Sequence, residues 1–183
     1  MKKKILSTLM VGILCLSVSE LSFSSVKKCP LDKEMKPWQW ENILAAYNRG
    51  KPHDLGYTLA SITIVETKAG LDTSNNASES YGITQILLTT AEKRLRDKGI
   101  TSTRESIKQQ LLSNDNFSYD LAIEELNYWN EIRDSNWRNM VRSYNAGWKQ
   151  YKGEPYLRKV IKRLNQLKQC DLEARSLKMT QSN

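Results

Sequence analysis

Catalysis by this chain would have to rest mainly on carboxylates, because the 183 residues include a single histidine. His53 lies in the polar stretch Gly50–Asp54, which is typical of an exposed loop. A Ser-His-Asp or Cys-His nucleophile would depend on this residue, and a zinc site would need several His and Cys ligands at close spacing. No glycine-rich phosphate loop is present. We therefore expect carboxylate chemistry with no metal and no cofactor.

Glu66 is the carboxylate in the most unusual position. A helix is predicted from near Asp54 to Gly70, and Glu66 interrupts its apolar stripe. Burial there would raise the pKa of the acid, as a general acid near neutral pH requires. The helical spacing alone favours a structural glutamate paired with Lys or Arg. The loop that follows the helix is rich in small hydrogen-bonding residues, which suit polar sugar groups, and it therefore favours a catalytic Glu66. The other residues of the stripe are Leu55, Leu59, Ile62 and Ala69.

The elements that must position Glu66 are mostly helices. Apolar residues recur at helical spacing, and turn and capping residues mark the ends of the segments. We predict helices over residues 37–50, 54–70, 114–132, 137–147 and 156–170, and two more that open at capping boxes, 89–92 and 102–105. Residues 71–86 are predicted to form a small irregular or β-hairpin element. The expected fold is one mainly α domain over residues 25–170, followed by a frayed polar tail, residues 171–183.

Residues 1–24 are typical of a secretory signal peptide. Three lysines follow Met1, and an apolar run extends from Ile5 to Ser19 and leads into small residues. Since this run is shorter than the roughly 20 apolar residues that span a bilayer, we expect cleavage and no stable membrane anchor. The protein is therefore expected in the periplasm or outside the cell.

Two cysteines remain after removal of the signal, Cys29 and Cys170, because Cys15 lies within it. In an oxidising compartment these two are predicted to form a disulfide, with two free thiols as the alternative. A bridge that closes nearly the whole domain would contribute up to ~5 kcal/mol of stability.

The basic charge indicates an anionic partner. The net charge is +8 for the whole chain and +6 without residues 1–24. An exported basic protein more often meets anionic membrane or cell-wall polymer than nucleic acid. We interpret the basic stretch Tyr156–Arg163 as the exposed face of a helix and expect no nucleic-acid partner.

Three segments resemble the landmark motifs of the soluble lytic transglycosylase (SLT) family, in the family's order. They are Ile64–Thr67, Ser80–Ile86 and Arg142–Gly147, and Glu154–Leu157 resembles the family's following segment. The resemblance covers about residues 55–164. It implies a lysozyme-like, peptidoglycan-cleaving domain.

The resemblance assigns a role to each matching residue. It places Glu66 as the catalytic acid and base, and Thr67, Ser80, Gln85, Tyr144 and Asn145 at the substrate. Thr67 stands where the family usually has serine, and either Ser78 or Ser80 matches the family's loop serine. Ile83 and Thr84 replace Leu-Met after Gly82, which predicts a more polar cleft wall.

The implied reaction cleaves the bond between N-acetylmuramic acid and N-acetylglucosamine and leaves anhydromuramic ends. A hydrolytic, goose-lysozyme-like muramidase is the alternative, with Asp72 or Glu79 as second carboxylate. A non-enzymatic wall-binding module is the alternative outside the enzymes. Trp148 is expected either to stack on a sugar ring or to pack in the core. We expect a monomer that binds glycan strands, and the sequence leaves open whether it serves a secretion, conjugation or phage lysis apparatus.

Overall fold

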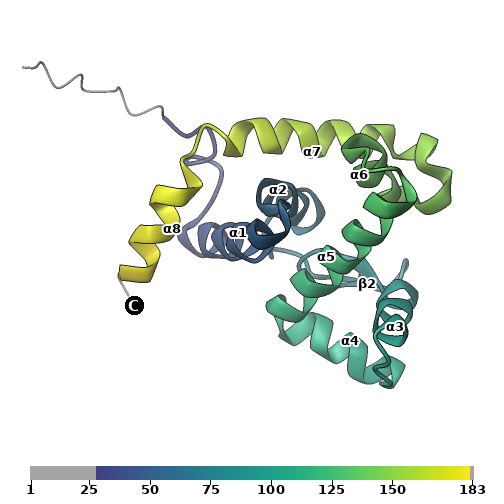
Figure 1. The fold of residues 1–183 in the computed structure, drawn as a ribbon. Coiled ribbons are helices and arrows are strands. Elements are labelled where there is room, and N and C mark those ends of the chain that lie inside the picture. The colour runs from purple at the N-terminus through teal and green to yellow at the C-terminus, as the bar shows by residue number, and fades with distance from the viewer. Residues whose placement is uncertain (1–27, 182–183) are drawn as a thin grey trace, which may run out of the picture.

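The computed structural model describes residues 28–181, so the predicted signal peptide lies outside the described residues. Helices form most of this part of the chain (Figure 1). They are α1 (Pro37–Gly50), η1 (Lys51–His53), α2 (Gly56–Thr67), α3 (Leu88–Asp97), α4 (Arg104–Ser113), α5 (Asp115–Ile132), α6 (Trp137–Ala146), η2 (Gly147–Gly153), α7 (Glu154–Leu167) and α8 (Leu172–Gln181).

The predicted small β element is a three-stranded antiparallel sheet. Its strands are β1 (Ser74–Asn75), β2 (Ser80–Tyr81) and β3 (Ile86–Leu87), in that order. Tyr81 pairs with Ser74 on one side and with Ile86 on the other. The prediction of a mainly α fold with a small β element at residues 71–86 is therefore confirmed.

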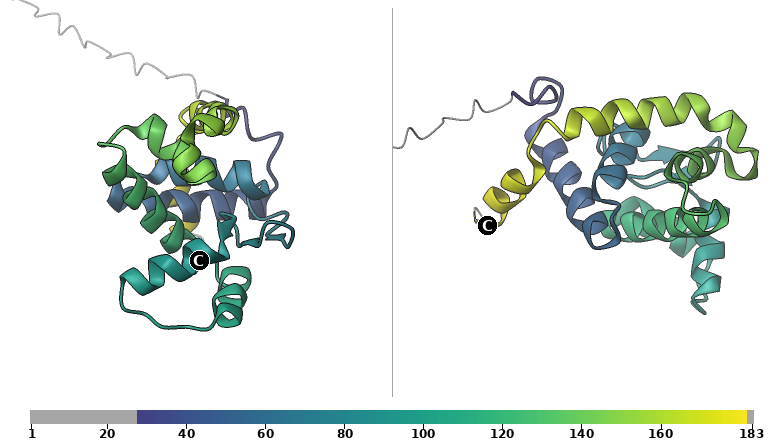
Figure 2. Two further views of the ribbon diagram at one scale, coloured as in Figure 1. Left: turned by 90° about the vertical axis from the view of Figure 1, so that its right-hand side faces the viewer. Right: turned by 45° about the horizontal axis from the view of Figure 1, so that its top comes forward.

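Helix α2 runs through the middle of the molecule and is buried along most of its length (Figure 1). It packs against α1 and α7, and Leu59 and Ile62 are fully buried in the core. Its buried hydroxyls stay hydrogen-bonded, since Thr63 Oγ1 donates to the Leu59 carbonyl and Thr58 Oγ1 accepts from Trp137 Nε1. Helices α3 and α4 lie at the end of the molecule opposite α7 (Figures 1 and 2).

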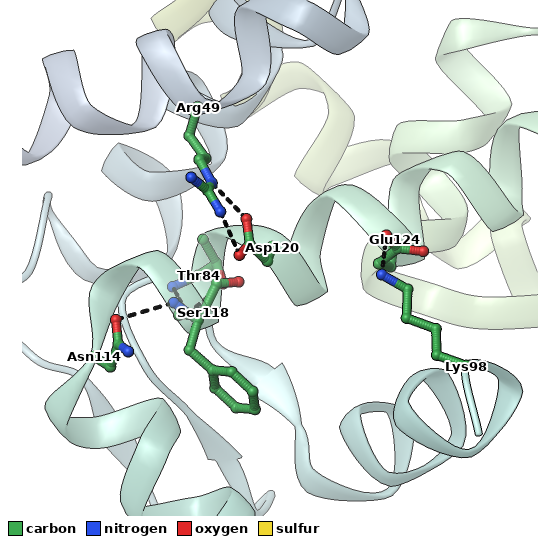
Figure 3. Close-up of polar contacts among 8 residues, drawn as sticks. Arg49, Thr84, Lys98, Asn114, Ser118, Asp120 and Glu124 are labelled. Carbon is green, nitrogen blue, oxygen red and sulfur yellow. Dashed lines mark hydrogen bonds and ion pairs between the residues drawn. The ribbon is translucent and has the colours of Figure 1, made fainter. Parts of the chain in front are cut away.

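Helix α5 ties α1, the loop after β2 and α3 together through polar contacts (Figure 3). Its N-cap Asn114 accepts a hydrogen bond from the helix backbone. Asp120 accepts two hydrogen bonds from Arg49 of α1, and Glu124 accepts one of 2.5 Å from Lys98, just after α3.

The predicted helices are present, and some of them begin or end at other residues than predicted because tertiary contacts set their limits. Helix α2 begins at Gly56 and ends at Thr67, inside the predicted range. Helix α3 begins at Leu88, before the predicted capping box, because the chain leaves β3 directly into the helix and buries Leu88. Helix α4 is capped by the Thr103 hydroxyl.

The C-terminal segment corrects the prediction of a frayed tail at residues 171–183. Residues Leu172–Gln181 form α8, which packs on α1, and Leu172 is fully buried. Glu173 accepts hydrogen bonds from Tyr47 and Lys51, and Arg175 binds Asp32 at 2.8 Å. These partners are more than 100 residues away in sequence, so local sequence patterns do not reveal them.

A disulfide joins Cys29 to Cys170, as predicted, with the two Cα atoms 4.4 Å apart. Both cysteines are buried, and the bridge fixes the start of the described chain to the junction of α7 and α8. His53 is exposed in η1, in agreement with the loop interpretation. Within residues 28–181, no helix has the length and apolar character needed to cross a membrane.

Candidate active site

Glu66 lies in the wall of a polar cleft of about 290 Å³, formed where the last turn of α2 meets the sheet, α3, α5 and α6. The cleft brings together residues that are widely separated in the sequence. It is lined by Glu66, Asn75, Ser78, Ser80, Gln85, Ile86, Leu87, Thr90, Glu125, Tyr144 and Asn145. Five of the six site residues that the sequence analysis proposed line it, namely Glu66, Ser80, Gln85, Tyr144 and Asn145.

Gly82 fixes the turn that presents Gln85 to the cleft. It has a φ of 81°, and a Cβ at this position would lie 2.6 Å from Ser118 Oγ and 2.7 Å from the Leu111 carbonyl oxygen. Glycine is therefore required here both for its conformation and for its small size. Gln85 also has a positive φ, 51°, and its amide donates to the Gly82 carbonyl at 3.1 Å.

Thr84 and Ile83 are buried behind the turn, which corrects the expectation that they form a more polar cleft wall. Both are fully buried and neither lines the cleft. The Thr84 hydroxyl is 2.7 Å from the Ser118 hydroxyl of α5 (Figure 3). Thr84, the polar residue in the replaced Leu-Met pair, thus anchors the turn to α5.

Thr67 also has a supporting position rather than a place in the cleft. Its buried hydroxyl lies 2.8 Å from the Ile83 carbonyl and 3.2 Å from the Thr63 carbonyl, and accepts from the Gly70 backbone N–H at 2.9 Å. The donor and acceptor capacity of this hydroxyl is therefore occupied inside the protein. Thr67 ties the end of α2 to the turn, and does not touch the space where a substrate would lie.

Both candidate loop serines face the cleft. Ser78 and Ser80 line it together, and their hydroxyl oxygens are 3.0 Å apart. Ser80 belongs to β2, whereas Ser78 lies in the turn between β1 and β2. The two hydroxyls form one polar group on the sheet side of the cleft.

Glu66 is the strongly perturbed acid of the cleft. Burial raises the pKa of its carboxyl from 4.5 to about 7. Two groups partly oppose this rise, the Tyr156 hydroxyl and the positive charge of Lys159. The Tyr156 hydroxyl is buried and is the larger of these two influences. The Glu66 carboxyl therefore changes between its protonated and charged forms near neutral pH.

Tyr144 and Asn145 reach the cleft from α6. The Tyr144 hydroxyl donates to the Thr84 carbonyl at 2.9 Å, and its ring stacks on Tyr156 with centroids 6.5 Å apart. Tyr144 therefore joins α6 to the turn and to α7. The tyrosine hydroxyl that lowers the pKa of Glu66 is that of Tyr156, a buried residue of α7 to which the sequence analysis gave no role in the site.

Glu125 is a cleft carboxylate that the sequence analysis missed. It lies 3.0 Å from the Arg94 guanidinium and accepts a 2.5 Å hydrogen bond from Trp129 Nε1. Burial raises the pKa of Glu125, while Arg94 and Trp129 act against that rise. Glu125 thus has a cation 3.0 Å away and a hydrogen-bond donor 2.5 Å away, whereas the charged form of Glu66 is favoured by the Tyr156 hydroxyl and by the charge of Lys159.

The two carboxylates proposed for the hydrolytic alternative lie outside the cleft. Asp72 and Glu79 are exposed, and neither lines the cleft. Glu79 forms a 2.8 Å ion pair with Arg104. Among residues 28–181, no group of three or more His, Cys, Asp or Glu side chains is arranged to hold a metal ion.

The site can transfer protons to and from a bound polar molecule. Glu66 supplies a carboxyl with a pKa of about 7, Glu125 a carboxyl paired with Arg94, and the serines, Gln85 and Asn145 supply hydrogen-bonding groups.

Comparisons with known proteins give one similarity of note. No protein-family model matches the chain, and no solved structure matches it. The chain is similar to an uncharacterized 20.7 kDa protein from the vs-regB intergenic region of Enterobacteria phage T4. The two are 30% identical over 171 residues, which cover 87% of this chain and 92% of the phage protein.

Proposed function

The chain belongs to the same family as that 20.7 kDa phage T4 protein, and we propose that it is a peptidoglycan lytic transglycosylase. In this proposal Glu66 is the single general acid and base. The observation that carries it is a partly buried carboxyl, with its pKa raised to about 7, in the wall of a cleft lined by hydroxyl and amide groups. The resemblance of the surrounding motifs to the SLT family supports the same assignment.

The proposed reaction uses the Glu66 carboxyl twice. Its proton passes to the glycosidic oxygen as the bond to C1 of N-acetylmuramic acid breaks, and the acetamido carbonyl of that sugar stabilises the positive charge at C1. The Glu66 carboxylate then takes the proton of the C6 hydroxyl, whose oxygen bonds to C1 and closes the anhydro ring. Water does not enter the product, so one buried acid of intermediate pKa is sufficient.

Hydrolysis is the second candidate, because Glu125 lies in the same cleft as Glu66. Most glycosidases use two carboxylates that flank the scissile glycosidic bond. The ion pair with Arg94 favours a charged Glu125, which would suit a base that activates water or an electrostatic stabiliser. The two candidates differ in their product by one molecule of water.

Mass spectrometry of digested peptidoglycan tests the proposal. We expect products with anhydromuramic ends from the wild-type protein, no product from Glu66→Gln, and unchanged products from Glu131→Gln. Glu131 is an exposed residue near the end of α5 and provides the matched control. Reducing muramic ends would instead assign hydrolysis, and cleavage by Glu66→Gln would remove Glu66 from the catalytic role.

The cellular setting is part of the same proposal. The signal-like residues 1–24 and the Cys29–Cys170 disulfide support an exported protein that acts at the cell wall on glycan strands. The net charge of +6 on the chain after residue 24 supports attraction to anionic wall polymer. The similarity to a phage protein favours a phage lysis setting over a secretion or conjugation apparatus.

A further inference from the structure

A second groove opens beside the catalytic cleft and continues it. Its volume is about 260 Å³, and it shares Thr90 and Glu125 with the cleft. We call it the side groove. It is lined by Thr89, Thr90, Lys93, Arg94, Glu125, Tyr128, Trp129 and Trp148.

Trp148 forms one wall of the side groove and is held in an exposed position. Its side chain is 66% exposed, although the ring packs edge-on against Trp129 with centroids 5.2 Å apart. The Arg133 guanidinium lies 5.3 Å from the Trp148 ring and bonds to Ser143 Oγ at 2.9 Å. Because the ring is already fixed, little conformational entropy is lost when a ligand binds to it.

The charge on the side groove is positive and localised at Lys93. Arg94, the other cation of the lining, is neutralised by Glu125 at 3.0 Å and Asp97 at 3.1 Å. Lys93 is exposed and forms no ion pair within residues 28–181, and its ammonium lies 5.1 Å from the centre of the Tyr128 ring. The groove therefore presents aromatic rings beside an exposed ammonium group, whose charge also lowers the pKa of Glu125 in the same lining.

We propose that the side groove binds the peptide stem of peptidoglycan, with Lys93 pairing with a stem carboxylate and Trp148 packing on the stem's apolar atoms. This inference rests on the proposed function of the neighbouring cleft. A glycan strand whose lactyl groups are amidated by stems carries no charge, whereas the stems carry carboxylates. An ammonium beside aromatic rings complements such an anionic peptide better than a neutral sugar.

Binding by the catalytically silent variant Glu66→Gln tests the side groove without depending on turnover. The probes are two soluble preparations of stem-bearing glycan fragments, one with free stem carboxylates and one with these groups converted chemically to neutral amides. We expect about three- to tenfold tighter binding of the free form, as for a charge-assisted hydrogen bond at a partly exposed site.

Second substitutions in the Glu66→Gln background test whether the tighter binding of free stem carboxylates, the carboxylate preference, arises in the side groove. Lys93→Gln is expected to abolish it, Lys93→Arg to keep it, and Trp148→Ala to weaken binding of both preparations by a similar factor. Lys162→Gln, an exposed lysine of α7, removes one positive charge elsewhere and is expected to keep the preference.

Equal binding of the two preparations, or a preference that survives Lys93→Gln, would overturn the side-groove proposal. Failure of the wild-type protein to cleave peptidoglycan would overturn the proposed function instead, and the binding comparison would still show whether Lys93 recognises stems.

Discussion

Replacement of Glu66 by glutamine is expected to stabilise the folded protein at alkaline pH while it removes the proposed activity. The substitution keeps the shape of the side chain and removes its ability to ionise. In the wild-type protein, ionisation of Glu66 leaves a charge in a buried position without a full ion pair, and only Tyr156 and Lys159 offset its cost.

The magnitude follows from the pKa of Glu66. The folded-state pKa of about 7 lies above the ordinary value of 4.5, so the folded state binds the proton more tightly than the unfolded chain. Stability from this group is complete below pH 4.5 and is lost as the pH rises through 7. At about 1.4 kcal/mol per pKa unit, the loss between pH 4 and pH 8 is roughly 3 kcal/mol.

Urea unfolding at pH 4 and pH 8, followed by tryptophan fluorescence with the disulfide intact, measures this difference. We expect the stability of Glu66→Gln minus that of wild type to be about 3 kcal/mol more favourable at pH 8 than at pH 4. With a urea dependence of about 2 kcal/mol per molar, the gap between the two midpoints should widen by roughly 1–2 M. Every other titrating group is common to both proteins and cancels in the comparison.

Glu131→Gln is the control, because it removes the same charge from an exposed position. Its stability difference from wild type should stay nearly constant between the two pH values. A constant difference for Glu66→Gln as well would refute the reasoning, since it would mean that the Glu66 carboxylate is solvated or paired in the folded protein.

Two further substitutions test the groups that support Glu66 and the cleft. Tyr156→Phe removes the hydroxyl that lowers the pKa of Glu66, so the alkaline limb of the pH–rate profile should move to higher pH; an unmoved limb would show that the hydroxyl does not act on Glu66. Thr67→Val removes the bonds to Ile83 and Gly70 and should cost about 1–3 kcal/mol in thermal unfolding, whereas Thr67→Ser should cost less than half as much; equal losses would attribute the effect to packing.

The position of Glu66 on an apolar stripe predicted a poorly solvated acid only together with the polar loop that follows it, and a stripe position was also present for Glu125. Leu121, Glu125 and Trp129 follow one another at i, i+4 and i+8 on α5, so Glu125 also interrupts a buried face. Spacing within one helix can therefore identify buried acids. It does not show that α2 and α5 bring these two acids to one cleft, because that depends on how the helices pack.

The place of Tyr156 beside Glu66 and the presence of helix α8 could not be predicted from neighbouring residues in the sequence. Tyr156 occupies an ordinary stripe position on α7, and its closeness to Glu66 arises from the packing of α7 on α2. Helix α8 has a mostly polar sequence and is held by Leu172, Glu173 and Arg175 through partners on distant segments. A helix stabilised in this way resembles a disordered tail when only its own residues are considered.

The same fold places the two cleft carboxyls in different electrostatic surroundings. Both are removed from water, which disfavours the charged form of each. Arg94 and the Trp129 indole N–H offset part of that cost for Glu125, and the Tyr156 hydroxyl and the charge of Lys159 offset part of it for Glu66. The cation beside Glu125 comes from α3, whose first turn also lines the cleft, so the placement of α3 sets how strongly the charged form of Glu125 is favoured.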